Sequence, residues 1–166
     1  LGLLKAITAA NFDECFPGQT TIQLAEDSIY EFVRNYDGAE PTKPHYMEYY
    51  ALPPITSDIV IEGNGATITN ISTQTLSAIH VEETGFLTLT QTIVSSFTRA
   101  GLINHGGLIV NESVFENNEV NSYALLDNGT SPAIITNSLF RNNTAGVEVG
   151  SYGAVVENNT FSENIH

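Results

Sequence analysis

The sequence predicts an all-β chain that winds into a right-handed parallel β-helix of about six coils, with a short capping helix at its N-terminal end. Three observations predict this fold. Similar segments recur at intervals of 21 to 25 residues, each contains short strand-like runs, and Gly and Asn separate those runs. Since 166 residues suit one compact domain, we expect a single β-helix domain over residues 1–166.

The N-terminal segment, residues 1–18, is the expected cap. Leu3, Leu4, Ile7 and Ala10 fall on one side of a short helix. An uncovered coil presents unpaired backbone groups, so we expect this helix to close the N-terminal end of the stack.

The first coils are interrupted by a long loop. Strand-like runs at 21–24 and 29–32 predict the first coil, and runs at 59–61 and 66–68 predict the next. Residues 34–54, between these coils, hold four of the six prolines, and we expect a loop there. The loop carries four tyrosines, which are Tyr36, Tyr46, Tyr49 and Tyr50.

Regular coils are expected over residues 59–166. Phe115, Phe140 and Phe161 occupy one position of successive repeats, and Val94 takes that position in an earlier copy. Aliphatic residues stand seven and five positions before each anchor, as period-two alternation requires for one face of a strand. These pairs, which should stack inside the coil, are Leu87/Leu89, Leu108/Val110, Ala133/Ile135 and Ala154/Val156.

An asparagine follows three residues after the last three anchors, at Asn118, Asn143 and Asn164. Equivalent positions of stacked coils lie about 4.8 Å apart, so each side-chain amide can hydrogen-bond to its neighbours above and below. We therefore expect an asparagine ladder, although Asn also simply tolerates turn conformations.

Apolar residues are also expected on the outside, six positions and one position before the anchors. They are Ile109, Ile134 and Val155, and Ile93, Val114 and Leu139. Stacked, they would form an apolar stripe, which either the 34–51 loop or a neighbouring subunit would cover. The sequence stops at Ile165–His166 beyond a complete coil without a capping segment, so we expect further residues or another molecule there.

A resemblance to a known family rests on several of these segments. They are Leu-Leu-Lys-Ala-Ile-Thr-Ala-Ala-Asn at 3–11, Leu-Pro-Pro-Ile-Thr at 52–56, Ile-Val-Ile-Glu-Gly-Asn-Gly-Ala-Thr-Ile at 59–68, and the Asn-Ser-x-Phe-x-Asn-Asn coils. Together they resemble the secreted right-handed parallel β-helix repeat proteins of bacterial and archaeal surfaces, whose N-terminal segment is of the Ser-Leu-Arg-Glu-Ala type. The resemblance implies a pectate-lyase-like fold and a secreted or cell-surface location.

Composition excludes several function classes. Five Lys and Arg against nineteen Asp and Glu give a net charge of −14, which repels nucleic acid and anionic lipid. No apolar run reaches the roughly 20 residues that span a bilayer, and one cysteine forms no internal disulfide. Carboxylates are scattered singly rather than spaced as in a calcium loop, so we expect no metal and no cofactor.

An enzymatic alternative rests on one weak constellation. Pectate lyases and polygalacturonases share the predicted fold, but a fold does not determine a function. Asn104, His105 and Asp127, with Glu82 and Glu148, could lie on adjacent coils. We favour the interpretation that Glu82, His105 and Glu148 are solvated turn residues, and we assign no catalytic residue. An enzyme built on this fold would be a polysaccharide lyase or a glycoside hydrolase.

Five Asn-x-Ser/Thr sequons are present, against roughly three expected by chance from this composition. The possible glycosylation sites are Asn70, Asn111, Asn128, Asn142 and Asn158; of these, Asn128 in a long turn and Asn111 at a strand edge are the acceptors we expect if the source glycosylates its secreted proteins.

The function expected from the sequence is that of a non-enzymatic extracellular structural or adhesive unit. It would associate with itself or with other surface proteins, and it could form fibres through its outer stripe and open coil ends. The alternative is a β-helix protein that binds or cleaves glycans, with Tyr49, Tyr50, His105 and Asp127 as its site.

Overall fold

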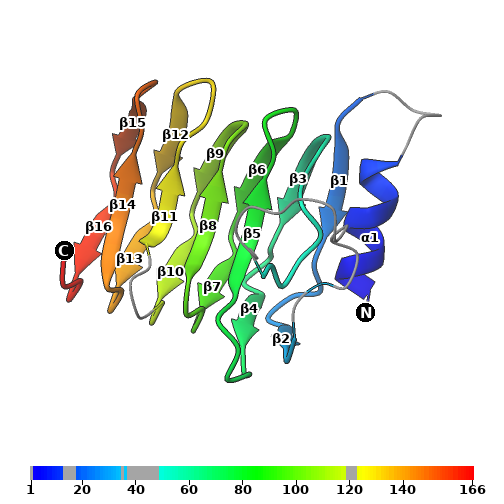
Figure 1. Cartoon of the computed structure of the whole chain (residues 1–166), viewed down its shortest axis with the longest axis horizontal. Coiled ribbons are helices and arrows are strands. Elements are labelled where there is room, and N and C mark those ends of the chain that lie inside the picture. The colour runs from blue at the N-terminus through cyan, green and yellow to red at the C-terminus, as the bar shows by residue number, and fades with distance from the viewer. Residues whose placement is uncertain (1, 13–17, 35, 37–48, 119–122) are drawn as a thin grey trace.

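The computed structural model describes residues 2–12, 18–34, 36, 49–118 and 123–166. These residues form a parallel β-solenoid with one short helix at its N-terminal end (Figure 1). Within the described ranges, all pairings between the named strands are parallel. The predicted all-β solenoid class is confirmed.

Three sheets run along the solenoid, and we call them A, B and C. Sheet A contains β1 (Thr20–Gln23), β3 (Asp58–Glu62), β6 (Phe86–Thr90), β9 (Gly107–Asn111), β12 (Ala133–Thr136) and β15 (Ala154–Glu157). Sheet B contains β2 (Ile29–Phe32), β4 (Thr67–Asn70), β7 (Ile93–Ser95), β10 (Val114–Glu116), β13 (Leu139–Arg141) and β16 (Thr160–Ser162). Sheet C contains β5 (Ser77–Val81), β8 (Ala100–Asn104), β11 (Tyr123–Asp127) and β14 (Ala145–Val149).

The number of coils differs from the expected six. Counting only described residues, sheets A and B have six strands each and sheet C has four, which gives about four complete turns. The coil that contains β1 and β2 and the coil that contains β15 and β16 contribute strands to sheets A and B but none to sheet C. Before β5, the described residues Tyr50 and Ile55 pair with that strand only as isolated bridges.

The N-terminal helix α1 (Gly2–Asn11) lies at the N-terminal end of the stack (Figure 1). It buries Leu3, Ile7 and Ala10, whose spacing of four and three residues places them on one helix face. The Asn11 side chain fixes the end of the helix, because Nδ2 donates to the Pro54 carbonyl at 2.7 Å and Oδ1 accepts from the backbone N–H of Thr56 at 3.0 Å.

The aromatic anchors stack in the predicted register. Phe115 pairs with Phe140, and Phe140 pairs with Phe161. Their rings are nearly parallel, with centroids 5.2 and 5.1 Å apart. Glycine at 101 gives this column room, since a Cβ there would lie 2.9 Å from the Phe115 ring and 2.5 Å from the Ala124 carbonyl oxygen.

The aliphatic columns of sheet A also have the predicted register. Leu89 pairs with Val110, which pairs with Ile135, and all three are fully buried. In the last coil the same columns are open, and Val156 and Phe161 are 42% and 49% exposed.

All six bends that join sheets A and B, and four of the bends that follow sheet B, contain residues in the left-handed region. Those between sheets A and B are Asp27, Gly65 with its neighbour Asn64, Gln91, Glu112, Asn137 and Asn158. Four more follow sheet B, at Ser96, Asn117, Asn142 and Glu163. Because the left-handed conformation reverses the chain over one residue, both bends recur at fixed offsets from the anchors.

Candidate functional site

The outer face of sheet A carries an exposed aliphatic row, which we call row A, formed by Ile109, Ile134 and Val155. These residues pair directly, Ile109 with Ile134 and Ile134 with Val155. Ile134 is 41% exposed and Val155 is 44% exposed, while Ile109 is half-buried. Their neighbours along each strand point inward, so row A belongs to the solvent face of the sheet.

A second row, row B, lies on the outer face of sheet B and consists of Ile93, Val114 and Leu139. These three side chains are half-buried and paired in register. Beside row B runs a polar row in which Arg141 Nε donates to Glu116 Oε2 at 2.7 Å. The sequence reasoning missed Ile29, a 67% exposed residue at the same register position two coils before Ile93.

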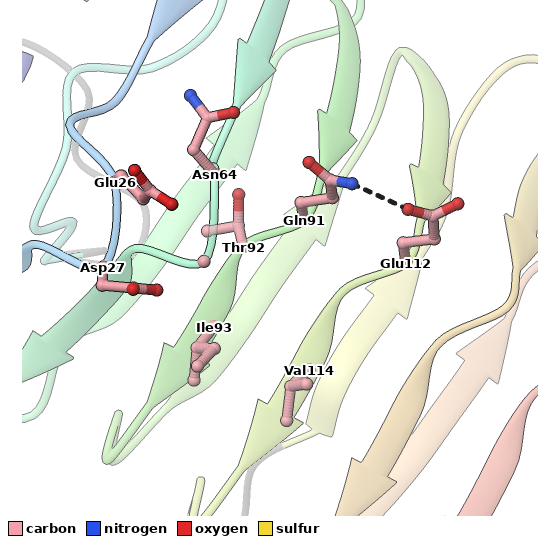
Figure 2. Close-up of a pocket in the computed structure, with 9 residues that line it drawn as sticks. Glu26, Asp27, Asn64, Gln91, Thr92, Ile93, Glu112 and Val114 are labelled. Atoms are coloured by element: carbon pink, nitrogen blue, oxygen red, sulfur yellow. Dashed lines mark hydrogen bonds between the residues drawn. The ribbon is translucent and has the colours of Figure 1, made fainter.

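Rows A and B do not form the single stripe expected from the sequence. The bend between the two sheets separates them, and its residues are polar. At this bend Gln91 Nε2 donates to Glu112 Oε2 at 2.9 Å (Figure 2). An open groove runs along the bend, lined on one side by Ile93 and Val114 and on the other by bend residues that include Glu112. The outer surface therefore offers two separate aliphatic rows on two faces.

The described part of the 34–54 loop lies against sheet C. Tyr50 packs with Ala100 and Ile103, and its ring stacks on His80 with centroids 4.4 Å apart. A contact between this loop and row A or row B would involve residues 37–48. These residues, which include Tyr46, lie outside the described residues.

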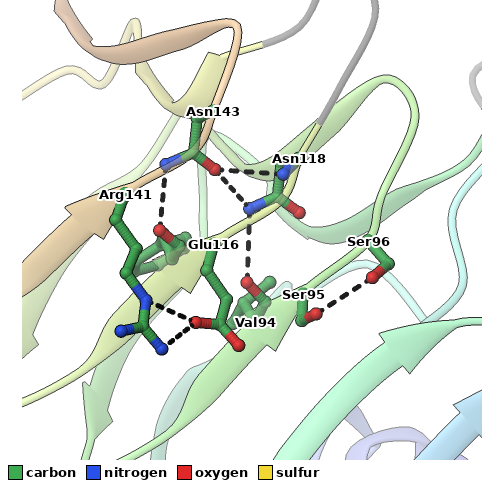
Figure 3. A network of polar contacts seen from close by, with 8 residues as sticks. Val94, Ser95, Ser96, Glu116, Asn118, Arg141 and Asn143 are labelled. Atoms are coloured by element: carbon green, nitrogen blue, oxygen red, sulfur yellow. Dashed lines mark hydrogen bonds and ion pairs between the residues drawn. The ribbon is translucent and has the colours of Figure 1, made fainter. Parts of the chain in front are cut away.

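The three ladder asparagines form a continuous hydrogen-bonded row, of which Figure 3 shows Asn118 and Asn143. Asn118 Nδ2 donates to Asn143 Oδ1, and Asn143 Nδ2 donates to Asn164 Oδ1, both at 3.0 Å. Backbone N–H groups of Asn118 and Asn143 donate to the same two oxygens at 3.1 and 3.0 Å. Asn118 and Asn143 are buried, so these amides satisfy backbone groups that water cannot reach.

A second polar row, absent from the sequence predictions, lies inside the bend between sheets A and B. The hydroxyl oxygens of Ser113 and Ser138 accept the backbone N–H groups of Thr92 and Ser113 at 3.3 and 3.2 Å. Asn159 Oδ1 then accepts the N–H of Ser138 at 2.8 Å. The signal was visible in the sequence, since a Thr, Ser or Asn stands two residues before each of the last four anchors.

The residues of the enzymatic alternative are divided between the inside and the outside of the coil. Asp127 is 2% exposed, and its Oδ1 accepts from Asn104 Nδ2 at 2.7 Å and from the N–H of Gly129 at 3.1 Å. Asn104 is fully buried, and its Oδ1 accepts a hydrogen bond from the N–H of Gly106 at 3.1 Å. Each side chain closes its own turn, so both residues have a structural role at the end of sheet C.

The aromatic residues of the glycan alternative also lack a shared open face. Tyr50 is 8% exposed and packs against sheet C, whereas Tyr49 is 39% exposed. His105 meets His80 edge to face at 5.2 Å rather than Asp127. The four residues Tyr49, Tyr50, His105 and Asp127 therefore do not converge on one surface.

Two pairs of titratable side chains involve residues of sheet C. His80 Nδ1 lies 3.6 Å from Glu82 Oε1. Glu148 accepts a hydrogen bond from Tyr123 and repels its phenolate, and together with slight desolvation this raises the pKa of Tyr123.

The sequons differ in their environment. Asn70 is 6% exposed, and its Oδ1 accepts the N–H and hydroxyl of Ser72 at 2.9 and 2.7 Å. Asn111 is half-buried. The side chains of Asn128, Asn142 and Asn158 are exposed.

Searches for metal sites, membrane spans and relatives gave negative findings. Among the described residues, no group of three or more His, Cys, Asp or Glu side chains could hold a metal ion. The one described helix, α1, is too short to cross a membrane. Comparisons with family models, with curated proteins and with solved structures found no match.

Proposed function

We propose that this chain is a non-enzymatic, extracellular structural or adhesive unit that associates with further copies of itself through its outer sheet faces. The observation that carries the proposal is row A, in which Ile134 and Val155 stand 41% and 44% exposed over adjacent coils. A regular aliphatic row on a flat sheet face is typical of an interaction surface.

A second copy is the occupant that best fits row A. Two sheet faces pack about 10 Å apart with interdigitated side chains, so a two-fold axis would place row A of one copy on row A of the other. Thr88 of β6 pairs with Ile109 and occupies the next position along row A. Its hydroxyl would make that end of the contact more polar.

Row B supplies a second contact on a different face. A molecule with one two-fold contact forms dimers, whereas two different two-fold contacts, one on sheet A and one on sheet B, extend the assembly into an open chain. Lateral assembly therefore requires no open coil end. Lateral assembly also agrees with the structure of the N-terminal end, where α1 lies over the first coil and Ile7 is completely buried. This covering argues against head-to-tail stacking onto the N-terminal end.

Charge modulates this association. A net charge of −14 makes copies repel one another, and salt screens that repulsion over a Debye length of about 8 Å at physiological ionic strength. Assembly should therefore be measured near 0.5 M NaCl, where hydrophobic contacts outweigh the residual repulsion.

The extracellular location belongs to the same proposal. Its support is the resemblance of the N-terminal segment and of the coils to secreted β-helix repeat proteins, together with the solenoid fold itself. Detection of the protein in the culture medium or in the washed surface fraction of its source, and not in the cell lysate, is the expected result.

The assembly prediction concerns one substitution on each face. Ile134→Ser should abolish contacts through row A and leave dimers made through row B, and Val114→Ser should do the reverse. The double variant should be monomeric. Sedimentation velocity and electron microscopy measure these states, with filaments expected for the unmodified chain.

Ile71→Ser is the matched control, because Ile71 is 55% exposed but belongs to neither row. It should assemble like the unmodified chain. Monomers of the unmodified chain at high concentration and high salt, or filaments of the double variant, would refute the proposal.

A further inference from the structure

The three exposed sequons lie on three different edges of the solenoid. Asn128 follows β11 at the edge between sheets C and A. Asn142 lies between β13 and β14, at the edge between sheets B and C, and Asn158 lies between β15 and β16, at the edge between sheets A and B. Each edge of the C-terminal half thus presents one exposed asparagine of an Asn-x-Thr motif.

The backbone at these edges directs the asparagines outward. Asn142 and Asn158 have φ values of 53° and 56°, and both are the single left-handed residue of their bend. Asn128 lies just after the last residue of β11, outside the strand. A substituent on any of the three side chains would extend into solvent without displacing a core residue.

In the other two sequons the asparagine side chain is hydrogen-bonded within the protein. Asn70 is buried, and its amide organises its own turn through Ser72 and through the Gln74 carbonyl, 3.4 Å from Nδ2. The Oδ1 of Asn111 accepts hydrogen bonds from Thr136 Oγ1 at 3.0 Å and from Asn137 Nδ2 at 2.8 Å. A glycan on Asn70 would require this turn to open.

We infer that Asn128, Asn142 and Asn158 are acceptors for N-linked glycans and that Asn70 and Asn111 are not. In this reaction the Nδ2 atom forms a bond to the anomeric carbon of an oligosaccharide carried on a lipid diphosphate. The lipid diphosphate leaves with the bonding electron pair, and the amide loses one proton. The hydroxyl of the residue two positions on completes the acceptor motif, and Thr130 and Thr160 are both exposed.

This arrangement would place glycans beside all three sheet faces. Glycans on Asn128 and Asn142 would stand at the two edges that bound sheet C. The glycan on Asn158 would stand at the edge between sheets A and B, so each of the three sheet faces would be bounded by two glycosylated edges. The inference is independent of the assembly proposal, because glycans could be present on a monomer and absent from a filament.

The test uses the protein isolated from its own source. Peptides are treated with an amidase that converts glycosylated Asn to Asp in ¹⁸O-labelled water, and the labelled positions are mapped by mass spectrometry. A sample without amidase is the necessary control, because the Asn128–Gly129 pair can also deamidate spontaneously. Label at Asn128, Asn142 and Asn158 with none at Asn70 and Asn111 is the expected result.

Variants made in a host that glycosylates secreted proteins give a second readout. Thr130→Ala and Thr160→Ala should each remove the mass of one glycan from the intact protein, whereas Ser72→Ala should remove none. An unmodified polypeptide mass in the native material, or an occupied Asn70 in the folded protein, would overturn the inference.

Discussion

Replacing Phe140 by alanine is expected to lower the free energy of unfolding by about 3 to 5 kcal/mol, the usual range for truncating a buried phenylalanine. Phe140 is fully buried and stacks between Phe115 and Phe161. Its loss would leave a cavity at the centre of the aromatic column. Urea unfolding followed by far-ultraviolet circular dichroism measures the change.

Phe161→Ala is the matched control for this prediction. Phe161 has the same neighbour on one side but is 49% exposed, so its truncation should cost about 1 to 2 kcal/mol. Equal losses for the two variants would show that Phe140 does not lie inside a stack. Since solenoids can unfold in parts, the slope of the transition should be compared between variants.

Replacing Asn143 by leucine should destabilise the protein by a similar amount, about 3 to 5 kcal/mol, because it leaves several buried groups without partners. The Oδ1 atom of Asn143 accepts two hydrogen bonds from Asn118, and its Nδ2 donates to the Phe115 carbonyl at 2.9 Å and to Asn164. Leucine has nearly the same size but satisfies none of these groups. The same urea experiment measures the loss.

Two further variants separate the ladder from a general effect of losing asparagine. Asn164→Leu removes a half-buried ladder residue, so its effect should be smaller than that of Asn143→Leu. Asn128→Ala removes an exposed side chain and should change stability by less than about 0.5 kcal/mol. A loss for Asn143→Leu no greater than that for Asn128→Ala would contradict the ladder's energetic role.

The stacking of the coils could be predicted from the sequence because each coil repeats the same constraint. Phe115 and Phe140 are separated by 25 residues and Phe140 and Phe161 by 21, yet the residues around each anchor keep the same offsets. Inserted residues between repeats enter the turns and leave the strand registers unchanged. Inward and outward positions near the anchors follow from strand alternation.

The arrangement of the sheets was harder to predict. Alternation does not show where a coil bends, because a left-handed residue can be Gln91 or Glu112 as well as Asn137. Rows A and B therefore looked like one stripe in the sequence although a bend separates them. The burial of Asp127 could not be predicted for a related reason. Its direction depends on the register of sheet C, where it pairs with the buried Asn104.

The direct stacking of matching segments is the central claim, and a disulfide experiment tests it most directly. Glu116 and Arg141 are paired on adjacent coils, so their Cα atoms should lie about 4.8 Å apart, within reach of a disulfide. Ser95 and Arg141 are two coils apart, at roughly twice that distance. In a Cys15→Ser background, the pair Glu116→Cys and Arg141→Cys should oxidise to an intramolecular disulfide, and the pair Ser95→Cys and Arg141→Cys should remain reduced. Cross-linking of the second pair but not the first would contradict the stacked register.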